Sequence, residues 1–372
     1  MSVAPRTWLL LAEKQGDNAQ VEALAGSLPW PCETRRLAMQ ERWLQGKPPV
    51  AASLDHLDLA ACDELAPPWP DLIVTMGRRT ANAAFWIREQ AKGRTKIVLV
   101  GKPSGWLERF DLVVGSAEVQ LPPFDNVASI GLPLLRVDPA DVAKAADAWR
   151  AEMADWPRPL VAVLVGGPTG PFAFDRAVRE RLVRLVRSVR ERGGTPFVTT
   201  SRRTPGEVAD ALEAALPEGG HLFRWSPEAP RNPYRALLGL ADGFAVTGDS
   251  ISMLVEVARL RRPLAIVPLS TGPLGALDQR RRAFTRWLFA RPGADGKGRL
   301  RAAVARGAFR AGLLTHTRDF NALHEWMVET GLAVWTDGEL PAEGFPAPSG
   351  DVDDDLNEAA ARVAALFEGP GR

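Results

Sequence analysis

The chain has 372 residues, of which 46% are apolar and 24% charged, which is typical of a globular protein with two domains and excludes a mostly disordered chain. Its 46 Lys and Arg nearly balance its 45 Asp and Glu, which argues against binding nucleic acid through bulk positive charge. The two cysteines, together with the lack of a spanning apolar run or a signal-like start, predict a cytoplasmic protein without a transmembrane segment.

Short apolar runs alternate with helical patterns in the first part of the chain. Helices are expected at 17–28 and at 77–90, and the residues at 77–80 open the second one. Strands that are apolar throughout and separated by helices predict a parallel sheet covered on both faces. The expected strands are 7–12, 71–76, 96–101, 111–115 and 127–131.

The second half repeats this pattern after a proline-rich stretch that contains one helix at 139–154. The expected strands are 160–165, 195–200, 221–225, 243–247 and 264–268. The expected helices between them are 175–192, 204–216, 232–240 and 250–260. Beyond residue 270 the pattern weakens, and helices are expected at 279–290, 319–330 and 354–367.

We therefore predict an α/β protein with two Rossmann-like domains, in which parallel sheets carry helices on both faces. The expected parts are an N-terminal domain at 1–135, a linker helix at 136–158 and a C-terminal domain at 159–335. The tail at 336–372 ends in a helix that could pack back on the N-terminal domain. Ligands of such domains sit at the carboxyl ends of the strands, here in the cleft between the two domains.

The strongest candidate site follows the strand at 243–247, where Thr-Gly-Asp-Ser leads directly into a helix. The free N–H groups of a first helical turn bind anions, and the Ser250 and Ser252 hydroxyls add donors. Asp249 belongs to the same turn, and Glu256, further along the helix, could accept hydrogen bonds from a ribose diol. The alternative is structural: Asp249 or Ser250 caps the helix, and Glu256 is a solvated side chain.

Two other loops of the C-terminal half also follow strands. The first is glycine-rich, which lets a backbone approach a phosphate closely or simply makes a tight turn. The second holds two arginines that could bind a diphosphate or that could be solvated while Thr204 caps the next helix. The candidate nucleotide-binding residues in these loops are Gly166, Gly167, Thr169, Ser201, Arg202 and Arg203.

Three turns of the N-terminal half would line the same cleft from the opposite side. Asp17 is the best-placed carboxylate for a general base, although it or Asn18 could instead cap the helix that follows. The candidate acceptor-side residues in these turns are Gly16, Asn18, Gly77, Arg78 and Lys102. The usual metal motifs are lacking, as is a Gly-x-Gly-x-x-Gly loop after the first strand, so neither a metal site nor a dinucleotide cofactor is predicted.

Five segments, taken together and in this order, resemble the mitochondrial fission "elongated mitochondria" family, which includes many bacterial members. The plant member is associated with the mitochondrial outer surface and with dynamin-related fission. The resemblance by itself implies no particular reaction. The matching segments are 16–20, 166–168, 200–205, 232–234 and 241–256.

The chain also resembles sugar-transferring enzymes in two places. The loop at 163–170 is similar to the Gly-Gly-Ser loop in the second domain of the N-acetylglucosaminyltransferase of peptidoglycan synthesis, with Pro168 in place of the Ser. The segment 241–268 resembles the donor site of GT-B glycosyltransferases, in which a helix N-terminus meets the diphosphate and a Glu meets the ribose. This likeness implies that Ser250 and Ser252 face phosphate and that Glu256 faces ribose.

The leading hypothesis is a GT-B-like, metal-independent glycosyltransferase of bacterial envelope or glycan metabolism. Its substrate would be a nucleotide-diphosphate sugar, it would need no cofactor, and an unknown acceptor would be held by the N-terminal domain, with Asp17 as base and Arg78 as an acceptor or phosphate contact. Two alternatives stay open: a non-catalytic scaffold of the mitochondrial-fission type and a nucleotide-sugar 2-epimerase. No nucleic-acid partner is expected, and peripheral contact with a membrane is left open.

Overall fold

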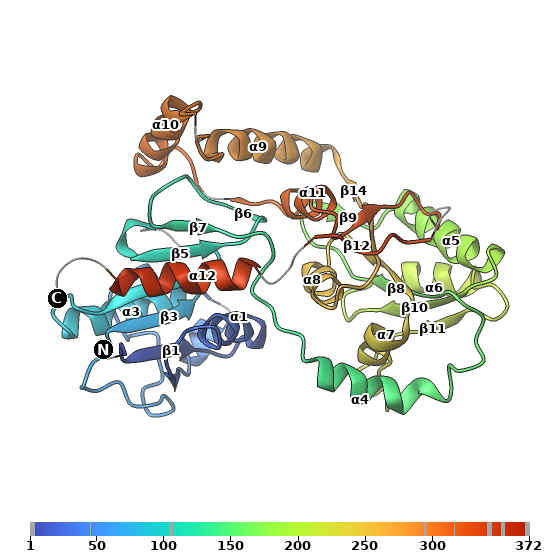
Figure 1. The fold of residues 1–372 in the computed structure, drawn as a ribbon, viewed down its shortest axis with the longest axis horizontal. Coiled ribbons are helices and arrows are strands. Elements are labelled where there is room, and N and C mark those ends of the chain that lie inside the picture. The colour runs from blue at the N-terminus through green and yellow to red at the C-terminus, as the bar shows by residue number, and fades with distance from the viewer. Residues whose placement is uncertain are drawn as a thin grey trace. The chain divides into compact units, whose positions relative to one another are not determined.

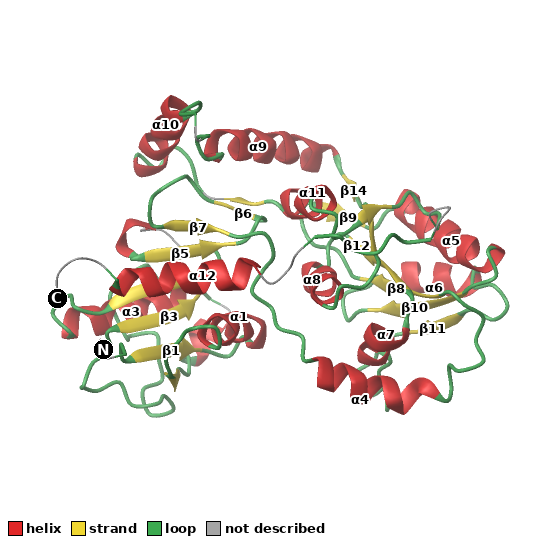
Figure 2. Cartoon of the chain, in the orientation of Figure 1, coloured by secondary structure: helices red, strands yellow, loops and turns green. Residues whose placement is uncertain are grey.

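A computed structural model describes residues 4–368, except 45, 104–106, 294, 316, 341–343 and 351–353. The chain divides into two compact units. Unit 1 consists of residues 1–136, 285–319 and 353–372, and unit 2 of residues 137–284 and 320–352. Each unit contains a six-stranded parallel sheet with helices packed on it (Figures 1 and 2). The predicted fold class, an α/β protein with two Rossmann-like domains, is therefore confirmed.

The sheet of unit 1 has the strand order β2-β1-β3-β4-β5-β7. This order reverses direction between β1 and β3, so right-handed crossovers place α1 (Gln15–Ala25) and α3 (Arg78–Gln90) on opposite faces. The strands are β1 (Thr7–Leu11), β2 (Cys32–Arg36), β3 (Leu72–Met76), β4 (Lys96–Val100), β5 (Leu112–Gly115) and β7 (Val127–Ser129). The reversal leaves a gap at the carboxyl ends of β1 and β3, where ligands of such sheets bind.

Both faces of this sheet are buried. One hydrophobic cluster joins the strands to α1 and to α12 (Asp354–Ala364), whose Ala359 and Val363 are fully buried. The other joins them to α3 through residues such as Trp8 and Phe85. The other elements of unit 1 are α2 (Glu41–Leu44), η1 (Leu107–Arg109), β6 (Val119–Gln120), α10 (Arg299–Arg310), β15 (Thr317–Arg318) and η2 (Ala365–Phe367).

Two features of unit 1 differ from the sequence expectations. The edge strand β2 was not expected, because its sequence CETRR carries almost no apolar pattern, yet it pairs with β1 along its whole length. Helix α1 begins at Gln15 with Lys14 as its N-cap residue, so the alternative in which Asp17 or Asn18 caps the helix is wrong. Both side chains lie within the first turn instead.

The sheet of unit 2 has the strand order β11-β10-β8-β12-β13-β16, which is the order 3-2-1-4-5-6 of the Rossmann fold. Its reversal lies between β8 and β12. The strands are β8 (Leu160–Val165), β10 (Thr195–Thr200), β11 (His221–Phe223), β12 (Gly243–Thr247), β13 (Leu264–Val267) and β16 (Val334–Trp335). Helices α5 (Arg176–Glu191) and α6 (Gly206–Ala214) share one hydrophobic cluster with the sheet, and α8 (Ile251–Arg259) packs on β12 and β13.

The stretch at 136–158, expected to be a linker helix, contains α4 (Pro139–Arg150), which groups with unit 2 and packs on α7 (Tyr234–Leu240). Helix α9 (Pro273–Phe289) carries the chain from unit 2 back into unit 1. The remaining elements of unit 2 are β9 (Phe172–Ala173), β14 (Ser270–Thr271) and α11 (Phe320–Glu329). Within the part of the chain that the structure describes, none of the helices has the length and apolar character needed to cross a lipid bilayer.

Helix α12 is held on unit 1 by a polar contact as well as by its buried alanines. The two carboxylate oxygens of Asp355 accept hydrogen bonds from the backbone N–H groups of Gly131 (2.8 Å) and Leu132 (2.9 Å). These two amides follow β7, so the contact ties the end of the chain to the sheet edge.

Replacing Asp355 with Ala should lower the free energy of opening α12 by about 2 kcal/mol, because two amides lose a charged acceptor. Amide hydrogen exchange of α12 measures this quantity directly. The matched control is Glu358→Ala on the exposed side of the same helix, which should change it by less than about 0.5 kcal/mol. Equal losses in the two variants would contradict the assignment.

Candidate functional site

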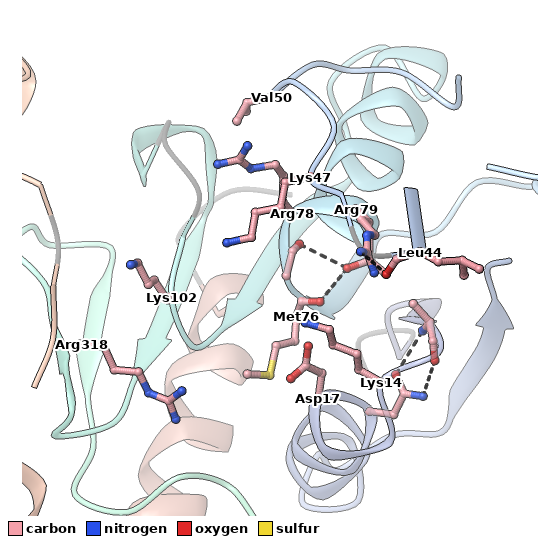
Figure 3. Close-up of a pocket in the computed structure, with 14 residues that line it drawn as sticks. Lys14, Asp17, Leu44, Lys47, Val50, Met76, Arg78, Arg79, Lys102 and Arg318 are labelled. Atoms are coloured by element: carbon pink, nitrogen blue, oxygen red, sulfur yellow. Dashed lines mark hydrogen bonds between the residues drawn. The ribbon is translucent and has the colours of Figure 1, made fainter. Parts of the chain in front are cut away.

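A basic pocket lies in unit 1, at the carboxyl ends of β1 and β3. Its volume is about 760 Å³. Six cationic side chains and one carboxylate line it, together with apolar atoms of Ala12, Leu44, Val50 and Met76. Figure 3 shows the charged side chains around a common space. They are Lys14, Lys47, Arg78, Arg79, Lys102 and Arg318, with Asp17 as the carboxylate.

Two helix N-termini border this pocket. Neither α1 nor α3 has a side-chain cap, so their first turns leave backbone N–H groups directed toward the strand ends. The N-cap residue of α3 is Gly77, whose φ of +94° is a backbone conformation that other residues rarely adopt. Two uncapped helix N-termini add positive potential to that of the cationic side chains.

Leu44 and the residues 46–50 form one wall of the pocket because two arginines of α3 hold them. Arg79 Nη2 donates to the carbonyl oxygens of Leu44 (2.6 Å) and Gly46 (2.8 Å), and Arg78 Nη1 donates to that of Pro48 (3.2 Å). The Arg78 Nε is buried, and none of the described residues is its hydrogen-bond partner. Arg79 therefore builds the wall, whereas Arg78 keeps a donor unused beside the pocket.

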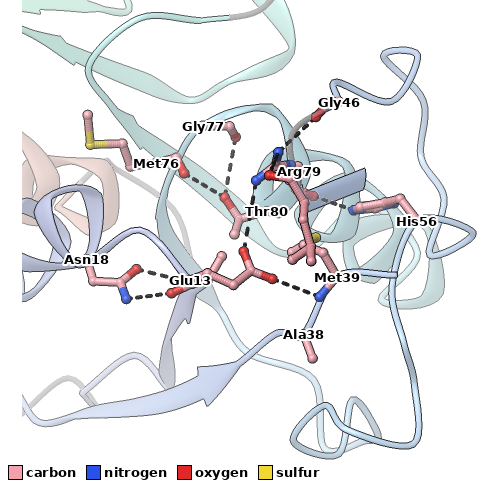
Figure 4. Close-up of polar contacts among 12 residues, drawn as sticks. Glu13, Asn18, Ala38, Met39, Gly46, His56, Met76, Gly77, Arg79 and Thr80 are labelled. Atoms are coloured by element: carbon pink, nitrogen blue, oxygen red, sulfur yellow. Dashed lines mark hydrogen bonds and ion pairs between the residues drawn. The ribbon is translucent and has the colours of Figure 1, made fainter. Parts of the chain in front are cut away.

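Further polar contacts fix Arg79 itself (Figure 4). Glu13 lies 3.9 Å from its guanidinium and accepts a hydrogen bond from the Met39 backbone N–H at 2.8 Å. His56 Nε2 lies 2.7 Å from the Arg79 carbonyl oxygen, and burial lowers the pKa of this imidazole. The first turn of α3 is thus anchored to the segment that follows β2.

Asp17 lies among the cations of the pocket. Burial raises the pKa of its carboxyl group, against the opposing effect of Lys14, Arg318 and Arg79. A carboxylate with a raised pKa is a stronger base than an ordinary Asp. The neighbouring Asn18 is fixed differently, because its side-chain amide both accepts from the Ala12 N–H (3.1 Å) and donates to the Ala12 carbonyl.

The acceptor-side residues expected from the sequence are mostly brought together. Asp17, Asn18, Gly77, Arg78 and Lys102 all line the basic pocket. Gly16 is exposed in the first turn of α1, and no atom lies within 4 Å of where its Cβ would be. Lys14, Lys47 and Arg318 also line the pocket but were not predicted. Lys47 and Arg318 do not follow strands of the predicted sheet, and Arg318 lies some 300 residues further along the chain than Lys14.

In unit 2, the loops after β8 and β12 are locked together. The Gly166 N–H donates to Thr247 Oγ1 and the Gly167 N–H to Asp249 Oδ2, each at 2.8 Å. A Cβ on Gly166 would lie 2.1 Å from Asp249 Oδ2 and from Ser250 Oγ. Glycine is therefore required here by the close approach of the β12 loop, and both amides are used inside the protein.

The loop after β10 joins the same network. Thr204 Oγ1 donates toward the carbonyl oxygens of Val165 (3.0 Å) and Gly166 (2.6 Å) and accepts from the Ser201 N–H (2.8 Å). Arg203 donates to Thr169 Oγ1 at 2.6 Å and lies 3.9 Å from Asp249. Thr204 was considered only as a cap, yet it connects the ends of β8 and β10.

Asp249 is the buried centre of these contacts, with its side chain fully shielded from solvent. Burial raises its pKa, although Thr247, Gly167 and Ser250 donate hydrogen bonds to it. Ser250 is the N-cap residue of α8 but donates to Asp249 (3.1 Å) rather than capping the helix. By contrast, Ser252 and Arg202 are exposed to solvent.

Glu256 is held by the only tyrosine of the chain. Its Oε2 accepts a 2.6 Å hydrogen bond from the hydroxyl of Tyr234, at the start of α7. Burial raises the pKa of Glu256, and burial together with the adjacent carboxylate raises that of Tyr234 well above its usual value. Tyr234 belongs to the Asn-Pro-Tyr segment used in the resemblance, so a sequence signal for this pair existed.

A buried histidine lies behind the β12 loop. His324 packs against Gly248 and the ring of Phe172, and its Nε2 has no hydrogen-bond partner among the described residues. Burial lowers its pKa to about 4, so the ring is neutral at pH 7. Among the described residues, no three His, Cys, Asp or Glu side chains gather as a metal site requires.

Residues 15–292 match the family model described as Mitochondrial fission ELM1. The chain belongs to this family. The Arabidopsis thaliana mitochondrial fission protein ELM1 is 29% identical to it over 220 residues, which cover 53% of this chain and 51% of the plant protein. The ELM1-family chain described here thus spans about half the length of that relative.

Two other proteins are similar to this ELM1-family chain. The uncharacterized protein RP120 of Rickettsia prowazekii (strain Madrid E) is 24% identical over 295 residues, covering 70% of this chain and 82% of that protein. The structure of UDP-GlcNAc 2-epimerase from Neisseria meningitidis bound to UDP-GlcNAc aligns with 98% of this chain and 100% of its own, at 10% identity and a TM-score of 0.45. The fold assignment rests on the strand orders given above.

Replacing Gly167 with Ala should lower the free energy of unfolding of unit 2 by about 1–3 kcal/mol, because the new Cβ would lie 2.1 Å from the Arg203 carbonyl oxygen. The matched control is Gly206→Ala, where nothing lies within 4 Å and the helix favours Ala. Chemical denaturation of both variants checks this. A Gly167→Ala protein as stable as the control would refute the locked-loop arrangement.

Proposed function

We propose that this ELM1-family protein transfers a sugar from a nucleotide diphosphate to a phosphate-bearing acceptor held in the basic pocket of unit 1. The observation that carries the proposal is the composition of that pocket, in which six cations surround a single carboxylate. Such an excess of positive charge favours a ligand with more than one negative charge. Phosphate and diphosphate groups meet that requirement in a volume of this size.

Asp17 is the proposed general base. It removes the proton from an acceptor hydroxyl, whose oxygen then bonds to the anomeric carbon of the donor sugar. The bond from that carbon to the diphosphate breaks, and the electron pair leaves with the nucleoside diphosphate. Arginine and helix N-termini stabilise the leaving group, so this step needs no metal ion.

Unit 2 is the proposed donor-binding unit. Two features support this assignment: its Rossmann strand order and the candidate loops at the reversal between β8 and β12. Because the Gly166 and Gly167 amides are used internally, the proposed phosphate contacts are the first turn of α8, the exposed Ser252 and the exposed Arg202. Glu256, oriented by the Tyr234 hydroxyl, is the proposed ribose contact.

A second candidate function is a non-catalytic scaffold of the mitochondrial-fission type, since the plant relative is named a mitochondrial fission protein. The inward-facing loop amides and the buried Asp249 carboxylate beside α8 favour it, because both reduce the capacity of this loop to hold phosphate. A 2-epimerase would use the same nucleotide sugar without consuming an acceptor.

Nucleotide binding distinguishes the enzyme from the scaffold. We expect one of the UDP-, GDP-, ADP- or CMP-sugars to stabilise the folded protein by about 2.7 kcal/mol at a concentration 100-fold above its dissociation constant, measured as a thermal shift. The Arg202→Gln variant should lose much of this shift, and Arg192→Gln, at the end of α5, is the control. No shift with any nucleotide sugar would favour the scaffold, and a changed sugar without acceptor would reveal an epimerase.

The basic pocket should bind a diphosphate diester, whose charge does not vary between mildly acidic and neutral pH. Lys102→Gln should weaken binding roughly tenfold, whereas Lys92→Gln, exposed elsewhere on unit 1, should leave it unchanged. Isothermal titration measures both. Identical affinities for the two variants would remove the pocket from the proposal.

The pH dependence of diphosphate binding measures the effect of the Asp17 carboxylate separately from that of the cations. Its ionised carboxylate repels an anion, so the affinity of the unmodified protein should rise as the pH falls through the raised pKa of this group. Asp17→Asn should bind as tightly at neutral pH as the unmodified protein does in acid, and should lose this pH dependence. If acidification strengthened binding equally in both proteins, the effect would come from another group.

A further inference from the structure

Helix α10 of unit 1 presents an apolar face to solvent. Leu300 is 80% exposed and Val304, one turn later, is 54% exposed. Ala303 and Gly307 share this face at helical spacing and are exposed as well. Leu313, just beyond the helix, is 79% exposed. Solvent-exposed helix faces normally carry polar residues, so this arrangement is the reverse of the usual one.

The opposite face of α10 is fixed to unit 1, so the helix cannot turn its apolar face inward. Ala302 and Ala305 are fully buried. Phe309 packs against the ring of Phe124, with 6.1 Å between the ring centroids. Arg306 donates a hydrogen bond to the Pro123 carbonyl oxygen at 3.2 Å. Figure 1 shows α10 in orange beside the β7 end of the unit-1 sheet.

Arginines flank the apolar face on both sides. Arg299 and Arg310 lie on one side of it, and Arg301 lies on the other, over the ring of the exposed Trp287. The segment 285–313 contains seven Lys or Arg and one acidic residue, a formal charge of +6 in a chain whose total is +1. In the structure, Glu108 lies 2.5 Å from Arg310 and Asp319 lies 4.0 Å from Arg286. The region around α10 therefore keeps an excess of positive charge that these two carboxylates reduce.

We propose that α10 docks unit 1 onto the surface of a lipid bilayer that contains anionic lipids. Leu300, Val304 and Leu313 enter the boundary between headgroups and acyl chains. Lipid phosphates contact the guanidinium group of Arg299 and compete with Glu108 for that of Arg310. Helices with an apolar face flanked by cations bind in this way, with the helix axis parallel to the membrane surface. The helix lies on the bilayer and does not span it.

Charge complementarity selects this occupant over a second copy of the chain. A second α10 would bring a second set of arginines to the same contact, since a symmetric contact joins the same surface patch of both copies. An anionic bilayer instead offers apolar depth and negative charge at the positions where α10 has apolar and positive groups. This inference does not depend on whether the protein transfers sugar.

The test is sedimentation of the full-length protein with vesicles. We expect binding to vesicles of phosphatidylcholine mixed with phosphatidylglycerol, little binding to phosphatidylcholine alone, and loss of binding at high salt. The double variant Leu300→Gln/Leu313→Gln should lower the partition coefficient by roughly tenfold or more, because both side chains contribute apolar burial.

The matched control is Leu59→Gln, which alters another leucine of unit 1 that is 59% exposed. It should bind vesicles as the unmodified protein does, and all three proteins should have the same melting temperature because the altered side chains are exposed. Equal vesicle binding by the double variant and the control would overturn the proposal. So would a lipid-free dimer that the double variant abolishes, because the face would then pair with a second copy.

Discussion

The reversal of strand order within a parallel sheet is the constraint on which the rest of this structure depends. In unit 1 the neighbours β1 and β3 send their helices to opposite faces, so no crossover covers the gap at their carboxyl ends. Into that gap come the uncapped first turns of α1 and α3, with Asp17 on one and Arg78 on the other. Leu44, the residues 46–50 and Arg318 then complete the walls of the pocket.

Unit 2 has the corresponding reversal between β8 and β12, but the gap at its strand ends is filled. There the gap is closed by side chains of the protein itself, with the buried Asp249 accepting a loop amide and Thr204 connecting the ends of two strands. An internal carboxylate thus takes the position that a phosphate takes in many nucleotide-binding loops. The two units have similar topology, yet one gathers unbalanced cations and the other uses its loop amides for hydrogen bonds within the protein.

The sequence predicts the buried strands well, because apolar runs of five or six residues leave little choice of structure. The bounds of β8, β10 and β12 agree with those expected. It does not predict β2, whose polar residues suit an edge, nor α10, whose apolar residues face outward and whose glycine-flanked start favours a turn. For the site, residues next to strands are found from their position in the chain. Lys47 and Arg318 are not, because only the folded chain brings those distant segments to the pocket.

The chain passes between the units four times, and this has a consequence for how the protein is made. Unit 1 contains the first strand and also α12, whose Ala359 and Val363 complete one of its two hydrophobic clusters. During synthesis, the N-terminal sheet must therefore leave that cluster uncovered until almost the whole of the chain described here has left the ribosome. Unit 2 consists of residues 137–284 and 320–352, so all of it is synthesised before α12 and it can be completed first. The unit that begins the chain is thus the last to be finished.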